Sequence, residues 1–597
     1  MSEYFAPQRD LKFAIEALVG LDELATLPGF EEVNQDLVEA ILEESGRFAN
    51  EVLAPLNVVG DRQGSVLTDD GVKTPDGFKD AYQQFIEAGW NGLTSDVDYD
   101  GQGLPIVLGS ATSEIWQAAN MSFALCPMLT ASAAKAINYH GDEQQKNAFL
   151  RKLISGEWSG TMNLTEPQAG SDLSAVATKA EPQGDGTYKL FGQKIYITWG
   201  DHDCAENVIH TVLARLPDAP EGVKGISLFI VPKYLVNDDG SLGNRNDVEC
   251  VSLEHKLGIH ASPTAVMGYG NNGGAIGYLV GEANRGLIYM FTMMNDARLA
   301  VGVQGVAIAE RAYQRALGYA KDRVQGRPVG TKVGDRVAIL HHPDVRRMLL
   351  TMKSQIEAMR AVYLVASAHL DFAKRATDPD SQQMHQSRAD LLIPVVKGWS
   401  TEVGFDLAAL GVQVHGGMGF VEETGAAQHL RDARIATIYE GTTGIQANDL
   451  VGRKMAGDDG ASLKELIADV QETVEDLSGS SQSDLERIAS KLSGANNALG
   501  LAVDELAQQL KTDPAGAMAS SVPFLMLVGY VTGGWQMARA AKVAAEKIEA
   551  GEDSEFHDAK LKTAVFYMHH VLPRAEALSR SCLASPRGLL DMAPEQF

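Results

Sequence analysis

The segment Tyr439–Gln446, YEGTTGIQ, places the carboxylate of Glu440 between an aromatic residue and a glycine. Loss of water around a carboxylate raises its pKa, which suits it to act as a general base. The glycine beside it lets a ligand approach the backbone closely. Glu440 is therefore the first candidate for a catalytic residue, although its local setting alone also fits an ordinary loop carboxylate.

A glycine pair precedes this segment in Gln413–Gly417, QVHGG, and Arg431 lies between the two segments. Adjacent glycines carry no side chain that would keep a phosphate away from the backbone. We expect this stretch to approach a phosphate-bearing ligand.

The segment Met162–Asp172, MNLTEPQAGSD, carries Thr165 and Ser171 beside a proline and a glycine that force a turn. Hydroxyls and backbone N–H groups on such a turn bind a polar ring edge or a phosphate. Taken alone, the segment also fits a plain loop between a helix and a strand.

The segment Lys194–Gly200, KIYITWG, has the pattern of a strand. Its Tyr196, Ile197 and Thr198 could flank a planar cofactor. The alternative is a half-buried strand without a ligand.

Two arginines, Arg298 and Arg323, would lie about seven turns apart if one helix joined them. They could then bind two distant anionic groups, and Asn295 lies one turn before Arg298. The alternative is a pair of solvated helix arginines.

Gly268, Gly270 and Gly273 spell GxGxxG, but the following AIGYLVGE has the pattern of a strand instead of a helix. A dinucleotide-binding turn requires the helix, so we interpret these glycines as a hairpin turn. The four cysteines lie far apart without CxxC spacing, which predicts buried free thiols and no metal site.

The spacing of apolar residues changes along the chain, and with it the predicted type of secondary structure. Helical spacing of apolar residues dominates to about residue 155, short β-branched runs follow from about 160, and helical spacing returns from about 285. A turn-rich break at 456–462 precedes a further helical stripe. The sequence predicts an α+β fold with a helical domain at 1–158, a β domain at 159–282, a helical domain at 283–457 and an added helical domain at 458–597.

The net charge of −27 disfavours nucleic acid and anionic membranes as partners. An anionic substrate would need a local basic pocket. The start of the chain lacks the apolar core of a signal peptide, and no run reaches the length of a membrane span. We expect no integral membrane association and a cytoplasmic location.

Together, the four segments resemble the acyl-CoA dehydrogenase family, in the same order and spacing over roughly residues 30–455. TEPQAGSD and YEGTTGIQ are highly specific in combination. The resemblance implies a helical domain, a small β domain and a helical bundle, with FAD as cofactor. Its implied FAD contacts are Met162, Leu164, Thr165, Ser171, Tyr196, Ile197, Thr198, Arg323, Gln413, Gly416, Gly417, Thr442, Thr443, Gly444 and Gln446.

The resemblance further implies that Ser171, Asn295, Arg298 and Gly441 contact the acyl-CoA substrate. Glu440 would remove the substrate α-proton while the β-hydride passes to the flavin. The product would be a trans-2-enoyl-CoA, and the electrons would pass to an electron-transferring flavoprotein.

Several positions depart from the family pattern. Tyr196 stands where Trp is usual, Trp199 where Asn is usual, and Asn295 where Asp is usual. The run Arg323–Gly326 lacks the Phe of the family motif.

The added domain resembles that of the larger members: very-long-chain enzymes and bacterial 3-methylmercaptopropionyl-CoA dehydrogenases. This implies a homodimer and either a medium- or long-chain substrate or 3-methylmercaptopropionyl-CoA. Two alternatives remain: an acyl-CoA oxidase that uses oxygen, and a non-catalytic flavin-binding scaffold that has turned to nucleic acid. Retention of Glu440 and the charge of −27 argue against the scaffold.

Overall fold

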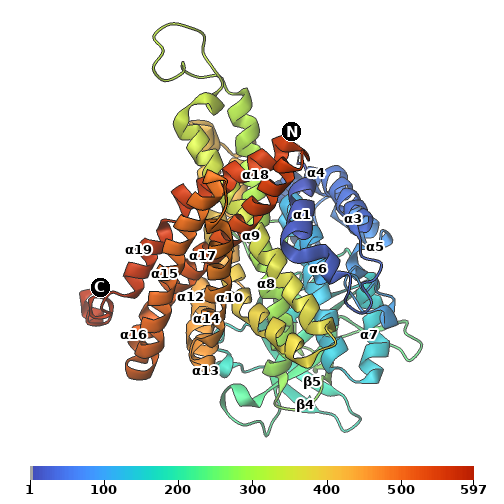
Figure 1. Cartoon of the computed structure of the whole chain (residues 1–597). Helices are drawn as coiled ribbons and strands as arrows, with labels where there is room; N and C mark the ends of the chain where they lie inside the picture. The colour runs from blue at the N-terminus through green and yellow to red at the C-terminus, as the bar shows by residue number, and fades with distance from the viewer. Residues whose placement is uncertain (1–3) are drawn as a thin grey trace. The chain divides into compact units, whose positions relative to one another are not determined.

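The computed structural model describes residues 4–597 and divides into two compact units (Figure 1). Unit 1 comprises residues 1–46, 105–118 and 301–597, and unit 2 comprises residues 47–104 and 119–300. The first three residues of the predicted domain 1–158 lie outside the described part of the chain.

Unit 2 is built around an eight-stranded sheet with the strand order β10-β11-β5-β12-β7-β6-β3, and β4 pairs with β5 and β6. The pairing of β3 with β6 is parallel, whereas β6 with β7 is antiparallel. The strands are β3 Trp158–Asn163, β4 Lys179–Pro182, β5 Tyr188–Thr198, β6 Asn207–Arg215, β7 Ile226–Pro232, β10 Val248–Leu253, β11 Thr264–Tyr269 and β12 Ala275–Leu279.

Both faces of this sheet are buried at its centre. Ile209 and Leu213 of β6 enter one hydrophobic cluster, whereas Val212 and Ala214 enter another. Successive residues of a strand point to opposite faces, so β6 supplies two cores. This explains why β7, ISLFIVP, is apolar almost throughout instead of alternating.

Helices and two small ribbons complete unit 2. The capping box at Asp142 and Gln145 fixes the start of α7, and the non-helical backbone of Asn120 interrupts α6, which begins in unit 1. These elements are α4 Ala54–Gln63, α5 Phe78–Glu87, α6 Ile106–His140, α7 Glu143–Ser155, β1 Val66–Thr68, β2 Gly71–Lys73, β8 Tyr234–Val236 and β9 Leu242–Arg245.

Unit 1 is helical, and its longest helices are α8, which begins in unit 2, α9 and α10. A three-residue connection joins α9 to α10, so the two helices pack against each other. The helices to residue 458 are α1 Gln8–Ala14, α2 Leu21–Leu24, α3 Gln35–Phe48, α8 Gly286–Asp322, α9 Pro343–Arg375, α10 Pro379–His415, α11 Ala426–Ala433, α12 Thr443–Asp449 and α13 Ala456–Asp458.

The turn at Asp459–Gly460 leads into the added helices, of which α14, α15, α17 and α19 lie side by side in Figure 1. Helix α17 also packs on α9 and α10. The added helices are α14 Ala461–Ser478, α15 Ser483–Thr512, α16 Pro514–Ala519, α17 Ser521–Glu549, α18 Ser554–Phe566, α19 Arg574–Cys582 and α20 Arg587–Leu590.

The order of helical, β, helical and added helical parts confirms the predicted α+β fold. Two smaller predictions are wrong. The glycines from Gly268 to Gly273 lead into a strand, but β11 and β12 do not form a hairpin because each pairs with β5. Cys250 is only partly buried, because β10 pairs with β11 alone and so lies at a sheet edge.

Across the described residues, no helix combines the length and the apolarity that a membrane span requires. The apolar run 522–531 lies within α17, where most of its side chains are buried.

Candidate active site

The Glu440 loop, Tyr439–Thr442, leads into α12 of unit 1. Glu440 has a φ of 54° and Gly441 a φ of 86°, so two consecutive residues are left-handed. For a non-glycine residue this conformation costs roughly 1–2 kcal/mol. Glu440 is half-buried, and the strained backbone must be held by its neighbours.

Two buried side chains hold the carbonyl groups of this loop. Gln446 Nε2 donates to the carbonyl oxygens of Glu440 at 3.0 Å and Gly441 at 3.1 Å. Lys397 Nζ, from α10, donates to the Gly441 carbonyl at 2.6 Å. Lys397 and Gln446 are both fully buried, so these hydrogen bonds form away from bulk water.

The residues on either side of Glu440 are also held. The Tyr439 hydroxyl donates to Gln304, and the pKa of Tyr439 is raised by its burial and, second, by the charge of Glu440. Thr442 accepts a hydrogen bond at the start of α12, and the Thr443 hydroxyl donates to Glu402 at 2.5 Å. The Thr443 side chain is thus engaged within the protein.

The glycine pair follows α10 directly. Gly416 ends the helix with a φ of 59°, and Gln413, Gly416 and Gly417 are exposed. A Cβ added at either glycine would meet no atom within 4 Å. Arg323, immediately after α8, is exposed as well.

In unit 2, a buried ion pair fixes the turn that carries Thr165. Lys194 Nζ donates to Glu166 at 2.8 Å and to the carbonyl of Leu164 at 3.0 Å. The Glu166 carboxylate also accepts from the backbone of Ala177 at 2.8 Å. Burial lowers the pKa of Lys194 to about 8, and Glu166 opposes that shift. The turn is therefore set by tertiary contacts as well as by its proline and glycine.

The end of β5 presents its three predicted residues differently. Tyr196 has a φ of 61° and is 60% exposed as a residue, whereas Ile197 lies in a hydrophobic core. Thr198 accepts a hydrogen bond from Thr161 through its carbonyl at 2.7 Å. Only Tyr196 and Thr198 thus offer side chains outside the core. Trp199 is buried and donates to the Ser122 carbonyl at 3.1 Å.

The other unit 2 candidates differ in exposure. Ser171 and Asn295 are exposed, while Met162 is buried at the end of β3 and Leu164 is half-buried. Arg298 is buried on α8, so the alternative of a solvated arginine is wrong for it. Arg323 does fit that alternative.

The sequence patterns did not select Lys397, Glu402 or Gln304 as functional. A signal existed for Lys397, because it directly follows the apolar run LLIPVV on α10 and precedes Gly398 and Trp399. Lysines are almost never fully buried without a partner, so a lysine in an apolar stretch marks a specific contact. The partners of Glu402 and Gln304 are set by tertiary packing.

Three observations fit a flavin dinucleotide to these residues. The exposed ring of Tyr196 can cover a planar group. The open space beside Gly416 and Gly417 admits a phosphate close to the backbone. Within the described chain, the buried Gln446 Oε1 has no hydrogen-bond partner, so it can accept from a hydroxyl of a bound group.

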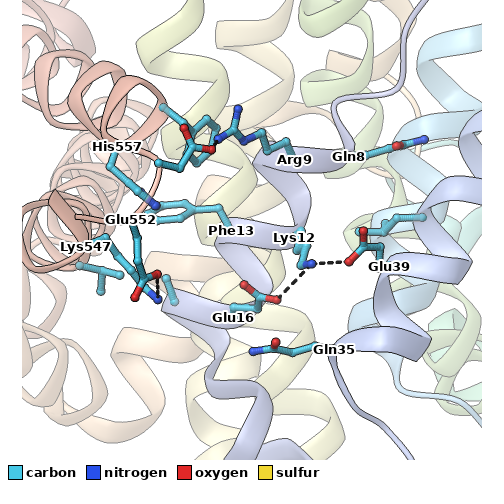
Figure 2. A pocket seen from close by; sticks show the side chains of 15 residues that line it. Gln8, Arg9, Lys12, Phe13, Glu16, Gln35, Glu39, Lys547, Glu552 and His557 are labelled. Carbon is cyan, nitrogen blue, oxygen red and sulfur yellow. Dashed lines mark hydrogen bonds and ion pairs between the residues drawn. The ribbon is translucent and has the colours of Figure 1, made fainter. Parts of the chain in front are cut away.

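A separate cavity of about 550 Å³ lies among α1, α3, α17 and α18, within unit 1 (Figure 2). None of the predicted site residues lines it. Lys12 pairs there with Glu39, and Lys547 pairs with Glu552 at 2.6 Å. Because Lys12 and Lys547 already pair with carboxylates of the protein, these two lysines do not require an anionic ligand to neutralise them.

Four family models match the chain in succession. They are the acyl-CoA dehydrogenase N-terminal domain at residues 36–157, the middle domain at 161–270, the C-terminal domain at 284–455 and the acetyl-CoA dehydrogenase C-terminal-like domain at 466–593.

Two curated proteins align over almost the whole chain. The 3-methylmercaptopropionyl-CoA dehydrogenase of Ruegeria pomeroyi is 51% identical over 96% of this chain and 97% of its own length. The broad-specificity linear acyl-CoA dehydrogenase FadE5 of Mycobacterium tuberculosis is 36% identical, covering 96% of each. The acyl-CoA dehydrogenase of Bacillus anthracis, solved with FAD, has a TM-score of 0.74 at 22% identity, covering 94% of this chain and 90% of that one.

Proposed function

The chain belongs to the acyl-CoA dehydrogenase family, and from this premise we propose that it oxidises an acyl-CoA thioester to the trans-2-enoyl-CoA, with FAD as cofactor and Glu440 as the base. The observation that carries the assignment of the base is the Glu440 loop. It sets one carboxylate on a strained backbone held by buried Lys397 and Gln446.

Glu440 removes the α-proton of the thioester in this proposal. A carboxylate is too weak a base for this proton unless the thioester carbonyl is polarised, and the backbone N–H of Glu440 donates to that carbonyl to stabilise the developing enolate. FAD, when bound, supplies the acceptor for the hydride from the β-carbon. Exclusion of water by the substrate brings the pKa of the base closer to that of the polarised substrate.

We assign FAD contacts to each unit separately. In unit 2 they are Met162, Leu164, Thr165, Ser171, Tyr196, Ile197 and Thr198, with Ile197 acting through its backbone because its side chain is in the core. In unit 1 they are Arg323, Gln413, Gly416, Gly417, Thr442, Thr443, Gly444 and Gln446. Thr443 also acts through its backbone, since its hydroxyl is bonded to Glu402.

The acyl-CoA ester is assigned Ser171, Asn295, Arg298 and Gly441. Arg298 is a cation within a chain of net charge −27, and a polyanionic CoA ester needs such a local positive group. Gly441 leaves room at the thioester because it carries no side chain.

Glu440→Gln tests the assignment of the base. The amide keeps the size of the side chain but cannot accept the α-proton at neutral pH. We expect FAD binding to survive and acyl-CoA-driven bleaching of the flavin to slow by about 10²–10⁴-fold, measured by stopped-flow absorbance. Bleaching at the unaltered rate would exclude Glu440 as the base.

For the substrate, we propose 3-methylmercaptopropionyl-CoA or a linear medium- to long-chain acyl-CoA. The Ruegeria pomeroyi relative is named for the first and the Mycobacterium tuberculosis relative for linear acyl-CoAs. A panel of thioesters, scored by the rate of flavin bleaching, distinguishes them. No bleaching with any member of the panel would sink the proposed reaction.

For the electron acceptor, we propose an electron-transferring flavoprotein, and the alternative is oxygen. Substrate-reduced protein should persist in air and reoxidise rapidly when the flavoprotein is added. Rapid peroxide formation in air would identify an oxidase instead.

We also propose the domain boundaries 1–158, 159–282, 283–457 and 458–597, a homodimer, and a cytoplasmic location. Light scattering of the FAD-loaded protein tests the homodimer, and a monomeric mass would refute it.

A further inference from the structure

We propose that Lys397 is a positioning residue of the reaction: its buried ammonium group holds the Gly441 carbonyl and thereby fixes the Glu440 carboxylate in its reactive place. The inference deepens the proposed function and rests on it. Lys397 lies in the middle of α10, and its side-chain Nζ reaches the loop at the Gly441 carbonyl.

The Glu440 loop needs such an anchor because its backbone adopts a conformation that is unfavourable for a residue other than glycine. Glu440 is left-handed at a φ of 54° without being glycine. A residue keeps such a conformation only when several contacts with its surroundings hold it there, and residues of this kind are frequent at active sites. A loop free of its tertiary contacts would relax, and the carboxylate would move with the backbone.

The anchoring bonds converge on two consecutive carbonyl groups. Lys397 binds Gly441 at 2.6 Å, and Gln446 binds both Glu440 and Gly441. A hydrogen bond from a charged donor is about twice as strong as a neutral one. Gln446 comes from α12, which begins two residues after Gly441, so it moves with the loop. Lys397 comes from a different helix, so its hydrogen bond ties the carbonyl beside Glu440 to α10, as the Tyr439 hydroxyl ties the other side of Glu440 to Gln304 of α8.

The helix that carries Lys397 is itself held firmly. Trp399, two residues further along α10, is fully buried and contacts α17. A Cβ on Gly398 would meet Leu525 of α17 at 2.8 Å and Gln446 at 3.4 Å. Packing thus fixes the backbone that directly follows Lys397, and this holds the lysine side chain in place against the loop.

The test compares Lys397→Met with Lys560→Met in the full-length, FAD-loaded protein. Met keeps the length and apolar stem of lysine but removes the donor. Lys560 is a matched control because it is also buried in unit 1, where it pairs with Asp10 and with Glu357 at 3.1 Å. For each variant we would measure FAD per chain, the thermal midpoint, the limiting rate of flavin bleaching and the half-saturating acyl-CoA concentration, using the thioester that bleaches the unaltered protein fastest.

Lys397→Met should lower the limiting bleaching rate by about 10- to 100-fold, because small displacements of a reacting group have effects of this size. The half-saturating concentration should stay within about threefold, since three of the four residues assigned to the acyl-CoA, Ser171, Asn295 and Arg298, lie outside this loop. Lys560→Met should lower the thermal midpoint at least as much and keep its bleaching rate. A rate for Lys397→Met within threefold of the unaltered protein would overturn the proposal, as would an equal loss of rate in Lys560→Met.

Lys397→Arg covers the case in which Lys397→Met fails to take up FAD. Arg retains a cation and N–H donors, so the flavin of Lys397→Arg should bleach faster than that of Lys397→Met if both variants bind FAD. Whether or not Lys397→Met binds FAD, the rate for Lys397→Arg should lie within about tenfold of the rate of the unaltered protein. A larger loss with FAD still bound would contradict the proposal. Glu440→Gln separates the two hypotheses: normal bleaching there refutes the base itself, whereas loss there with an unaffected Lys397→Met refutes only the positioning role.

Discussion

Buried lysines serve the two candidate ligand loops in the same way. Lys194 donates to the carbonyl of Leu164 in unit 2, and Lys397 donates to the carbonyl of Gly441 in unit 1. Each lysine comes from a regular element and holds an irregular segment. The strand or helix fixes the backbone of the lysine. The ammonium group then fixes the position of one carbonyl group in a loop that has no periodic hydrogen bonds of its own.

Asp371 shows how a single buried residue makes stability depend on pH. Its carboxylate accepts from the backbone N–H groups of Ile106 at 2.8 Å and Val107 at 3.1 Å, at the start of α6. Burial raises the pKa of Asp371 from 3.8 to about 7. The folded state therefore binds this proton more tightly than the unfolded state, and the stability it gives is lost as the pH rises from about 4 through 7.

Asp371→Asn should flatten that part of the pH profile, because the amide keeps an acceptor for the helix start and does not ionise. We expect the urea midpoint of the unaltered protein, relative to the variant, to fall between pH 4 and 7. Matched urea titrations of both proteins across this range test it. Parallel profiles would show that Asp371 is not the responsible group.

At the scale of elements, helix α17 packs on α10 at Gly529 and Gly533, whose missing side chains form a notch in the surface of α17. A Cβ on Gly529 would approach the Trp399 ring to 2.3 Å, and one on Gly533 would approach it to 2.8 Å. The large aromatic side chain of α10 thus occupies the space that two missing side chains leave on α17. The notch brings the added helices against the helix that carries Lys397.

Gly529→Ala should destabilise the protein by about 1–3 kcal/mol, because the added methyl overpacks a filled core. Gly494→Ala is the matched control, since Gly494 lies within α15 and a Cβ there meets nothing within 4 Å. Alanine at such a site should stabilise by about 0.4–1 kcal/mol. Denaturant titrations compare the two, and an equal effect in both would exclude the notch as the cause.

At the scale of the whole molecule, the added helices complete unit 1 instead of forming an independent attachment. Phe524, Leu525, Leu527 and Val528 of α17 are fully buried. Burial of each such side chain contributes roughly 1.5–3 kcal/mol. Their removal would also uncover the Trp399 side of α10.

Deletion of residues 458–597 should therefore yield a chain that fails to fold into an FAD-binding protein. The deletion removes α17, and the apolar faces of α9 and α10 that α17 covers would become exposed to water. Soluble yield and FAD per chain, measured beside the full-length protein, test this. A soluble deletion variant with full FAD content would show that the core of unit 1 stands without these helices.

The sequence alone predicted the α+β order of the fold and membership of the family. These depend on the apolar periodicity of long segments and on the motifs TEPQAGSD and YEGTTGIQ, which are local properties of the chain. It also marked Glu440 by its neighbours. The glycines at Gly268–Gly273 show what the sequence could not predict. Their spacing predicted a turn, but it did not predict that β11 and β12 each pair with β5.

Only the tertiary structure decided what holds Glu440. Lys397 lies 43 residues before it, Gln304 bonds its neighbour Tyr439 from α8, and Leu525 of α17 supports the backbone beside Lys397. No periodicity or spacing rule links residues on different helices, because their contacts depend on how the helices pack. Eight consecutive residues mark Glu440 as the proposed base, whereas the packed helices of unit 1 determine where its carboxylate lies.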